Sequence, residues 1–294
     1  MGIDRTGLLT ILSTVASHYG RFQGVHLCEL GNQRITKGAL TVLTEWGYSP
    51  DLHDLLSILQ GLSTTPSPTI APGKKIFERL GFIHTSLDIN GRDGAVEVDL
   101  SRPLNTSLRV LGMCDVVTNF GTTEHVGESD YVEADVDLLD IWSSQYEAFR
   151  NLHRLARRDG LIINMVPAAG CWPRHGAVEY EPRFFEALAN ATGYEIMNLS
   201  LHRPSYYWTT DETSFFWDLL QKLLARESLQ LPASVDPEDM FIMPHMNKAQ
   251  QGNILSVFRP SSAFIDKSTF LRLPGLHQKS KEPRVQNCLT RASG

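Results

Sequence analysis

Polar side chains follow four apolar, β-branched segments of the sequence, each at the point where the segment ends. A carboxylate in such a place can accept both hydroxyl protons of a ribose, which is why nucleotide-binding sheets carry an acid at that edge. An acidic residue followed by an apolar one suits an adenine ring, and a glycine lets the backbone approach a ligand closely. The residues in these places are Glu29 with Gly31, Asp88, Asp99 with Leu100, and Asn119 with Phe120 and Gly121.

Each of these positions also has a structural interpretation, because Asp and Asn commonly cap the helix that follows a strand. A single glycine after a strand is most often only a turn. Four such sites at successive strand ends are harder to explain by capping alone. The pattern therefore predicts a nucleotide-like ligand at one edge of a sheet.

Two histidines follow the fourth and fifth apolar segments and are candidate general bases. His125 comes soon after the fourth, and His175 lies in the stretch PRHGAVEY after the fifth, so both can face one pocket. Histidine is the side chain used most often for proton transfer near neutral pH. Tyr180 is a third candidate, and a structural role remains open for both histidines, including for His125 as a cap of the next helix.

Metal and disulfide chemistry receive less support from the spacing. Cys171, His175, His125 and Glu124 could be assembled into a metal site, but their spacing matches no standard metal motif, so no metal is predicted. The four cysteines lie far apart with no CxxC pair, which argues against a disulfide scaffold and against a cysteine-built zinc site.

The elements that must position these residues alternate along the chain. Apolar or β-branched runs predict strands, and apolar residues at helical spacing predict the helices between them. Strands separated by helices form a mostly parallel sheet with helices on both faces. The predicted strands are residues 25–30, 82–89, 95–100, 114–119, 161–166, 194–201 and 253–258, and the predicted helices are residues 38–45, 74–80, 140–157 and 184–191.

The order of these pieces resembles the class I S-adenosylmethionine-dependent methyltransferases, above all the methyltransferase-domain proteins of bacterial cell-surface polysaccharide clusters. The segments that carry the resemblance are CELG, SLDIN, VDLSRPL, DVVTNFGTTEHV, NLHRLARRDGLIINMVP and HGAVEYEPRFFEALANATGYEI. They span residues 22–201, about 60% of the chain. The resemblance implies a Rossmann-like methyltransferase fold, α/β with a mostly parallel seven-stranded sheet, and S-adenosylmethionine as the cofactor.

The resemblance also assigns roles. Glu29 and Gly31 would lie near the methionine end of the cofactor, Asp88 would bind the ribose hydroxyls, and Asp99 with Leu100 the adenine. Asn119, Phe120 and Gly121 would form the floor beside the sulfonium. Asn32, Gln33 and Arg34 depart from the family, which carries further glycines after the one that matches Gly31. Either Asn32 or Gln33 supplies contacts to the cofactor, or cofactor binding has been lost.

The expected activity is methyl transfer to a small-molecule acceptor, a sugar or a biosynthetic intermediate, by direct displacement at the methyl carbon. The sulfonium is already activated, so the protein would contribute positioning and, with His175 or His125, a base. The alternative is a degenerate member of the same fold that acts as a binding or assembly subunit. A nicotinamide-dependent oxidoreductase is disfavoured because GxGxxG is absent after the first strand.

Composition limits partners and location. The 27 basic and 33 acidic side chains give a net charge of −6, which argues against a surface that binds nucleic acid. No run is apolar and long enough for a membrane span, so we expect a cytoplasmic protein. Eight acidic residues and no Lys or Arg lie between residues 121 and 149, where a solvated lid or a charge-selective loop is expected.

The predicted organisation is a methyltransferase-like domain over residues 1–260 and a basic extension over residues 261–294. A helical cap is predicted within the domain, over residues 203–248, where aromatic residues cluster. Its apolar side is interpreted as ordinary core, a homodimer contact or a substrate-binding surface. The extension is interpreted as loosely docked, or as an arm over an anionic ligand or a neighbouring subunit.

Overall fold

The computed structural model describes residues 3–36, 39, 69–128, 138–172, 175–202, 253–261 and 263–278. The chain divides into two compact units. The described part of the first unit comprises residues 3–25, 33–36, 39 and 69–83, and the second contains the other described residues. The predicted cap over residues 203–248 lies outside the described residues, as do residues 279–294 and the predicted helix 38–45 apart from residue 39.

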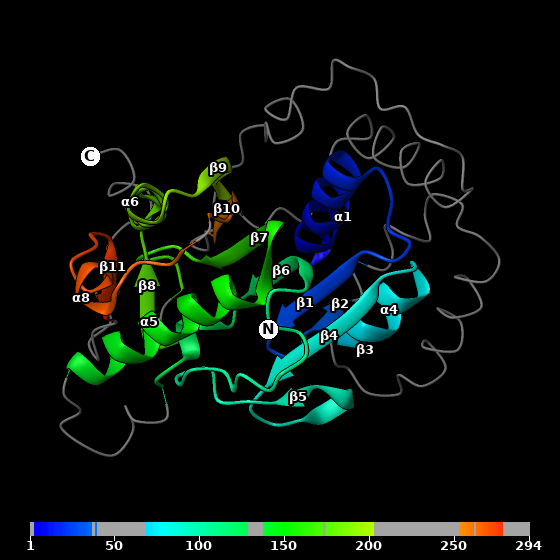
Figure 1. The fold of residues 1–294 in the computed structure, drawn as a ribbon, viewed down its shortest axis with the longest axis horizontal. Coiled ribbons are helices and arrows are strands. Elements are labelled where there is room, and N and C mark those ends of the chain that lie inside the picture. Colours follow the sequence, from blue (N-terminus) through cyan, green and yellow to red (C-terminus); the bar gives the residue numbers. More distant parts are fainter. Residues whose placement is uncertain are drawn as a thin grey trace. The chain divides into compact units, whose positions relative to one another are not determined.

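A seven-stranded sheet in the order β5-β4-β1-β6-β7-β10-β9 forms the second unit (Figure 1). The pairings β1–β6, β4–β5 and β6–β7 are parallel, whereas β10 runs antiparallel to both of its neighbours. All seven predicted strands are present, but the strand predicted over residues 95–100 is shorter, and the one predicted from residue 161 begins earlier. They are β1 (His26–Leu30), β4 (Ile83–Asp88), β5 (Val96–Glu97), β6 (Cys114–Phe120), β7 (Ala156–Pro167), β9 (Glu195–His202) and β10 (Asn253–Arg259).

One face of this sheet is covered by α5 (Leu138–Leu155) and α6 (Pro182–Thr192). The helical spacing that predicts α5 places Phe149 and Leu152 on its buried side, and α6 contributes Phe184 and Phe185 to the same core. Alternate residues of β1, β6 and β7 face these helices, while the residues between them are buried on the other face of the sheet. Burial on both faces explains why the strands are nearly continuous apolar runs.

The junction between α5 and β7 differs from the prediction. The sequence pattern predicts a helix over residues 140–157 that the turn Asp159-Gly160 ends, but the helix ends at Leu155 and the strand begins at once. Gly160 lies inside β7, and a Cβ there would come 2.9 Å from the Asp115 carbonyl oxygen. The glycine is therefore needed for a close approach to the neighbouring β6 and does not end the helix.

The described part of the basic extension is folded into the second unit. Asp266 caps the short helix α8 (Lys267–Phe270) by accepting the Thr269 N–H at 3.0 Å. Phe270 is buried against the core, and β11 (Leu276–Gln278) pairs antiparallel with β8 (Val178–Tyr180). The expectation of a loosely docked extension is therefore wrong for these residues. The boundary at residue 260 stays a prediction.

The first unit contains a helix that sequence analysis did not predict, α1 (Arg5–Tyr19). Asp4 caps it by accepting the Gly7 N–H at 2.8 Å, and Gly20 ends it in the left-handed conformation. The same unit contains the antiparallel pair β2 (Arg34–Thr36) and β3 (Thr69–Pro72), followed by α4 (Gly73–Arg79). The last of these confirms the helix predicted over residues 74–80.

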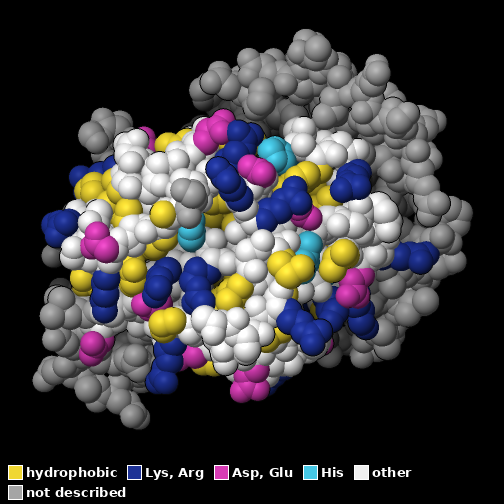
Figure 2. Space-filling model, viewed as in Figure 1, with side chains coloured by type: hydrophobic (Ala, Val, Ile, Leu, Met, Phe, Trp, Pro, Cys, Tyr) yellow, Lys and Arg dark blue, Asp and Glu magenta, His cyan; other side chains and the backbone are white. Residues whose placement is uncertain are grey.

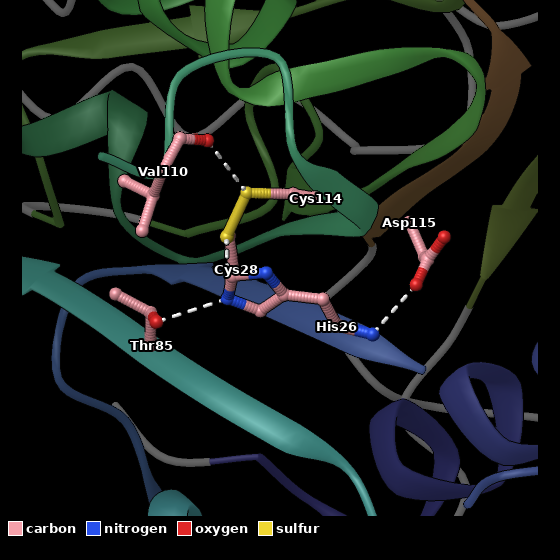
Figure 3. The surroundings of a disulfide bond; sticks show 6 residues. All are labelled: His26, Cys28, Thr85, Val110, Cys114 and Asp115. Carbon is pink, nitrogen blue, oxygen red and sulfur yellow. Dashed lines mark hydrogen bonds between the residues drawn. A yellow bond between two sulfur atoms is a disulfide. The ribbon is translucent and has the colours of Figure 1, made fainter. Parts of the chain in front are cut away.

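A disulfide joins Cys28 of β1 to Cys114 of β6 across a sequence separation of 86 residues. Figure 3 shows His26 beside it, with a backbone N–H that donates to Asp115 Oδ2 at 2.7 Å and a ring nitrogen 3.0 Å from Thr85 Oγ1. The sequence spacing gave no sign of this bridge, because the two cysteines meet only through the pairing of β1 with β6. The bridge thus ties together two strands whose ends carry predicted site residues.

Charges of both signs are interspersed on the surface seen in Figure 2, where Lys and Arg side chains lie among Asp and Glu. One pair on the second unit is Arg157 with Asp115, and another is Arg259 with Glu195. Among the described helices, none combines the length and apolar character that crossing a membrane requires.

Candidate functional site

The ends of β1 and β4 are joined through Asp88. Its Oδ2 accepts the Asn32 N–H at 2.6 Å and its Oδ1 accepts the Asn90 N–H at 3.0 Å. Gly31 adopts a positive φ of 73° and donates its N–H to the Leu87 carbonyl at 2.8 Å. A turn of this shape favours glycine, and it sets a half-exposed carboxylate beside the loop after β1. Each carboxylate oxygen keeps lone pairs for further donors.

Asn32, the first residue that departs from the family pattern, is held in this corner by its side chain. Its Nδ2 donates to the Arg92 carbonyl at 2.9 Å and to Asp93 Oδ2 at 3.2 Å. Its Oδ1 is buried and accepts no hydrogen bond within the described part of the chain. A buried acceptor without a donor is costly. The residue that binds Asp88 through its backbone therefore also presents an unsatisfied acceptor.

The predicted adenine contacts lie in a tight turn after β5. Asp99 Oδ1 accepts both the N–H and the hydroxyl of Ser101, at 2.9 and 2.6 Å, and its Oδ2 pairs with Arg102 at 3.1 Å. Leu100 is buried, and its carbonyl accepts the Asn151 side chain at 3.2 Å. The turn is thus fixed locally and also anchored to α5. A role in adenine binding stays a prediction.

Glu29 is fully buried on β1, on the sheet face opposite Cys28. Its Oε2 lies 3.6 Å from Nε2 of His84, which is buried on the neighbouring β4. The carboxylate is therefore enclosed beside an imidazole. Contact with the methionine end of a cofactor remains the prediction for Glu29.

A ladder of buried side chains crosses the sheet below the turn η2 (Thr123–His125), which follows β6. Asn164 of β7 accepts the Asn119 side chain at 3.1 Å and donates to the Ser256 hydroxyl at 3.1 Å. Asn119 also accepts the Thr123 N–H at 3.1 Å. This amide, predicted for the floor of the cofactor site, is fully buried and fixes the start of η2. Phe120 is largely buried, and Gly121 has a φ of 64°.

Gln145 of α5 and Tyr180 of β8 hold the same turn from the other side. Gln145 Nε2 donates to the carbonyls of Thr123 and Val126 at 2.7 and 2.9 Å. The Tyr180 hydroxyl lies 2.8 Å from Gln145 Oε1 and 3.0 Å from Thr123 Oγ1. Burial is the main reason that the pKa of Tyr180 is raised well above its usual value, with Glu124 adding to it. A phenol that stays protonated in this way is a poor base.

Three functional side chains converge above this scaffold, from η2 and from the loop before β8. His125 Nε2 lies 3.3 Å from His175 Nε2, and Glu124 Oε1 lies 3.4 Å from His175 Nε2 and 3.9 Å from His125 Nε2. His125 Nδ1 contacts Glu128 Oε2 at 2.5 Å. We call Glu124, His125 and His175 the Glu–His–His cluster. The two predicted bases therefore do lie together, and a carboxylate joins them.

Gly176 allows the loop that carries His175 to lie directly on η2. It has a φ of 74°, and a Cβ there would come 2.8 Å from the Glu124 side chain. The next residue, Ala177, donates its N–H to the Glu124 carbonyl at 2.8 Å. Any other residue at position 176 would push His175 away from Glu124.

The strand order places this chain in a definite fold class. A sheet of seven strands, parallel except for β10, which is antiparallel between β7 and β9, is the Rossmann-like methyltransferase fold expected from the sequence. The residues described above follow β1, β4, β5 and β6 at the carboxyl edge, where such sheets bind ligands. Function has to be argued from the site itself, since one fold supports many activities.

Comparison with known proteins gives matches to solved structures only. No protein-family model matches the chain, and no curated protein matches its sequence. Among the solved structures, 1,6-didemethyltoxoflavin-N1-methyltransferase from Burkholderia thailandensis, with its substrate and S-adenosylhomocysteine bound, is 11% identical with a TM-score of 0.38, and the match covers 86% of this chain and 77% of that one.

Two further matches have different reactions in their names. The [4+2]-cyclase SpnF is 12% identical with a TM-score of 0.37, covering 88% of this chain and 82% of that one. Geranyl diphosphate C-methyltransferase from Streptomyces coelicolor A3(2), with Mg²⁺, geranyl diphosphate and S-adenosylhomocysteine bound, is 10% identical with a TM-score of 0.31. This match covers 85% of this chain and 79% of that one. Identities and TM-scores this low carry no argument about activity or substrate.

Several residues that build the site were not found from the sequence. Gln145, Asn164 and Ser256 lie on separate elements and meet Asn119 or Thr123 only in the folded sheet. Glu128 was noted only as one of the acidic residues of a lid. Its spacing of three residues from His125 was the available signal, since residues three apart on a helical turn are neighbours.

Proposed function

We propose that this chain binds S-adenosylmethionine at the ends of β1, β4 and β5, and transfers its methyl group to a small-molecule acceptor. When bound, the cofactor would supply an activated methyl carbon. The chain's own residues would bind and orient the cofactor and the acceptor, exclude water from the site, and take a proton from the acceptor. The acceptor is expected to be a sugar or a biosynthetic intermediate.

The observation that carries the proposal is the corner formed by Asp88, Gly31 and Asn32. The half-exposed carboxylate of Asp88 is fixed by two backbone N–H groups and keeps lone pairs for the two hydroxyl donors of a ribose. The Asn32 Oδ1 atom, buried without a donor, would gain one from the ligand. The residues present thus fit a nucleoside, and Asn32 takes the place of a family glycine as a contact.

The corner is also connected to the part of the site that would handle the acceptor. The Thr122 hydroxyl, just before η2, donates to the Leu30 carbonyl at the end of β1 at 2.8 Å. The loop after β6 is thereby fixed to the strand that leads to Gly31. One rigid edge of the sheet can then position both the ligand and the acceptor. Such positioning supplies much of the acceleration of a displacement reaction.

Within the Glu–His–His cluster, His175 is the favoured base. Its Nε2 lies 3.4 Å from the buried Glu124 carboxylate, which would stabilise the imidazolium formed when His175 takes a proton. Glu128 orients the His125 ring through Nδ1, so His125 can receive the proton next through the 3.3 Å contact between the two Nε2 atoms. Tyr180 is better explained as a support of η2 than as a base.

Calorimetric titration with S-adenosylmethionine and S-adenosylhomocysteine tests cofactor binding. We expect micromolar binding of either ligand, and Asp88→Ala should weaken it about tenfold or more, since a charge-assisted hydrogen bond contributes about 1.5–3 kcal/mol. The control is Glu186→Ala, which removes an exposed carboxylate of α6 and should leave affinity unchanged. Absence of binding to folded wild-type protein would overturn the proposal.

The second candidate function is a degenerate member of the fold that binds a ligand or partner without methyl transfer. It is favoured by the short connection after Gly31, because only Asn32 and Gln33 separate it from β2. The expected distinction is kinetic. A methyltransferase consumes S-adenosylmethionine when an acceptor is supplied, whereas a binding subunit holds it unchanged.

A further inference from the structure

We propose that Glu124, His125 and His175 form a binding site for a divalent first-row transition-metal ion such as Zn²⁺. The proposal does not depend on binding of S-adenosylmethionine. It rests on three features of the described residues: the spacing of the donor atoms, the burial of Glu124, and the contact of Glu128 with the outer side of His125.

The three donor atoms are spaced as metal ligands are. The triangle formed by Glu124 Oε1, His125 Nε2 and His175 Nε2 has edges of 3.3, 3.4 and 3.9 Å. The point equidistant from its corners is about 2.1 Å from each atom, which is the distance at which zinc binds imidazole nitrogen and carboxylate oxygen, about 2.0–2.2 Å. One ion could therefore contact all three donor atoms at these distances.

Glu124 points to a positive charge at this place. Its side chain is fully buried, and neither carboxylate oxygen accepts a hydrogen bond within the described part of the chain. A buried carboxylate without hydrogen-bond donors is unstable unless a cation compensates it. Two imidazole nitrogens lie 3.4 and 3.9 Å from Oε1, and imidazole nitrogens are common metal ligands.

Glu128 gives His125 the environment of a ligating histidine. A carboxylate in contact with Nδ1 at 2.5 Å accepts the ring proton, which leaves the Nε2 lone pair directed at the cluster. Histidines that bind metals commonly donate their other ring N–H to a carboxylate in this way. The turn is already fixed by Asn119 and Gln145, so little ordering is needed when the ion binds.

The donor set selects the class of ion. Two imidazole nitrogens and one carboxylate oxygen suit zinc or another first-row transition ion, whereas magnesium and calcium prefer oxygen ligands alone. Three protein ligands leave a position open for water or for a hydroxyl of the acceptor. An ion here would use the lone pairs that His175 and His125 otherwise offer as bases, and would itself acidify the bound hydroxyl.

Metal uptake by the intact chain, without an oligohistidine tag, tests the proposal. Competition with a chromophoric chelator should show one Zn²⁺ bound per chain, and Co²⁺ should give the visible absorption of a four-coordinate site. His175→Ala and Glu124→Gln should abolish both signals. Glu128→Gln should weaken binding about 10–100-fold, the usual effect of losing an outer partner of a ligating histidine.

Two controls separate this site from other donors. His277 also lies against a carboxylate, 2.7 Å from Glu181 Oε1, so His277→Ala should keep full affinity. His26→Ala should also keep it, which excludes a site built by His26, Cys28 and Cys114, whose two cysteines are joined in a disulfide. Circular dichroism verifies folding, and the half-exposed Glu128 provides a variant that leaves the buried core intact.

Failure of this proposal is distinguishable from failure of the proposed function. If wild-type protein takes up no metal, or if His175→Ala and Glu128→Gln both bind it as wild type does, the metal site is wrong. Binding of S-adenosylhomocysteine at the Asp88 corner is tested separately, by the calorimetric titration of wild type and Asp88→Ala.

Discussion

Asp88 and Glu124 are acidic residues that follow two strands of one sheet, yet their surroundings are opposite. Asp88 is half-exposed, and each of its oxygens accepts a backbone N–H. Glu124 is buried, and within the described residues neither of its oxygens accepts a hydrogen bond. The first carboxylate organises a loop and keeps lone pairs for ligand hydroxyls. The second lies beside two imidazoles, which is why it points to a proton or a metal ion.

The disulfide offers the most severe way to disturb both acidic sites at once, because it joins β6, which leads to Glu124, to β1, whose following residue Asn32 binds Asp88. Closing a loop with a sequence separation of 86 residues stabilises the folded state by about 4 kcal/mol in the chain-entropy description. We expect reductant to lower the free energy of unfolding of the wild type by about this amount more than it lowers that of a variant without the bridge. Urea unfolding followed by tryptophan fluorescence measures it.

The control for this prediction is the double variant Cys28→Ala with Cys114→Ala. Cys171 is also disulfide-bonded, so reductant has a second target, and the relevant quantity is the difference between its effects on the two proteins. Equal effects on wild type and double variant would show that the bridge between β1 and β6 does not stabilise the fold.

Gln145→Leu should separate the two acidic sites, since Gln145 supports η2, whereas Asp88 is held by the backbone N–H groups of Asn32 and Asn90. It leaves the Thr123 and Val126 carbonyls without their donor, and we expect a loss of about 3 kcal/mol in the free energy of unfolding. Metal affinity should fall as well, whereas binding of S-adenosylhomocysteine should persist.

The matched substitution on the same helix is Glu147→Ala. It removes an ion pair with Arg150 at 3.4 Å near the surface, which is expected to cost less than about 1 kcal/mol. A loss as large as that for Gln145→Leu would mean that α5 is sensitive to any change. The hydrogen bonds to η2 would then not be the cause.

His153 is a half-buried titratable group that, unlike Glu124, has a neutral hydrogen-bond partner, the Tyr194 hydroxyl at 2.8 Å from Nδ1. Burial lowers its pKa. A histidine with a lowered pKa stabilises the fold above its unfolded-state value of about 6.5, and this stability is lost as pH falls through the folded pKa. We expect the smallest of the three effects here, a decline in stability between pH 7 and pH 5.

His153→Gln sharpens this test, because the amide keeps an acceptor for Tyr194 and cannot titrate. Urea unfolding at several pH values should show a shallower decline for the variant than for the wild type. Identical slopes would assign the pH dependence to other groups.

Much of the sheet could be predicted because its strands are short apolar runs bounded by polar residues. The positions of Asp88, His125 and His175 follow from that pattern, since strand ends of a parallel sheet share one edge. The bridge between Cys28 and Cys114 could not be predicted, because only the register of β1 against β6 brings them together. The ladder from Ser256 to Asn119 has the same cause, as its members belong to three different strands.

The helix α1 was missed for a different reason. Residues 6–16 are buried on every side of the helix, so the sequence has no one-sided apolar stripe, and only Asp4 at its start and Gly20 at its end indicate a helix. The end of α5 was misplaced because Gly160 was interpreted as a stop signal. A glycine that permits close strand packing has the same appearance in a sequence as one that ends a helix.

The placement of β10 has a consequence for the order in which the chain can fold during synthesis. β10 (Asn253–Arg259) lies between β7 and β9, so β9 cannot join the sheet until residue 259 has left the ribosome, whereas β7 can already pair with β6. β11 then pairs with β8, whose Tyr180 supports η2. The support around the Glu–His–His cluster is therefore completed only after residue 278 has been synthesised, and the apolar edge of β7 stays exposed until β10 pairs with it.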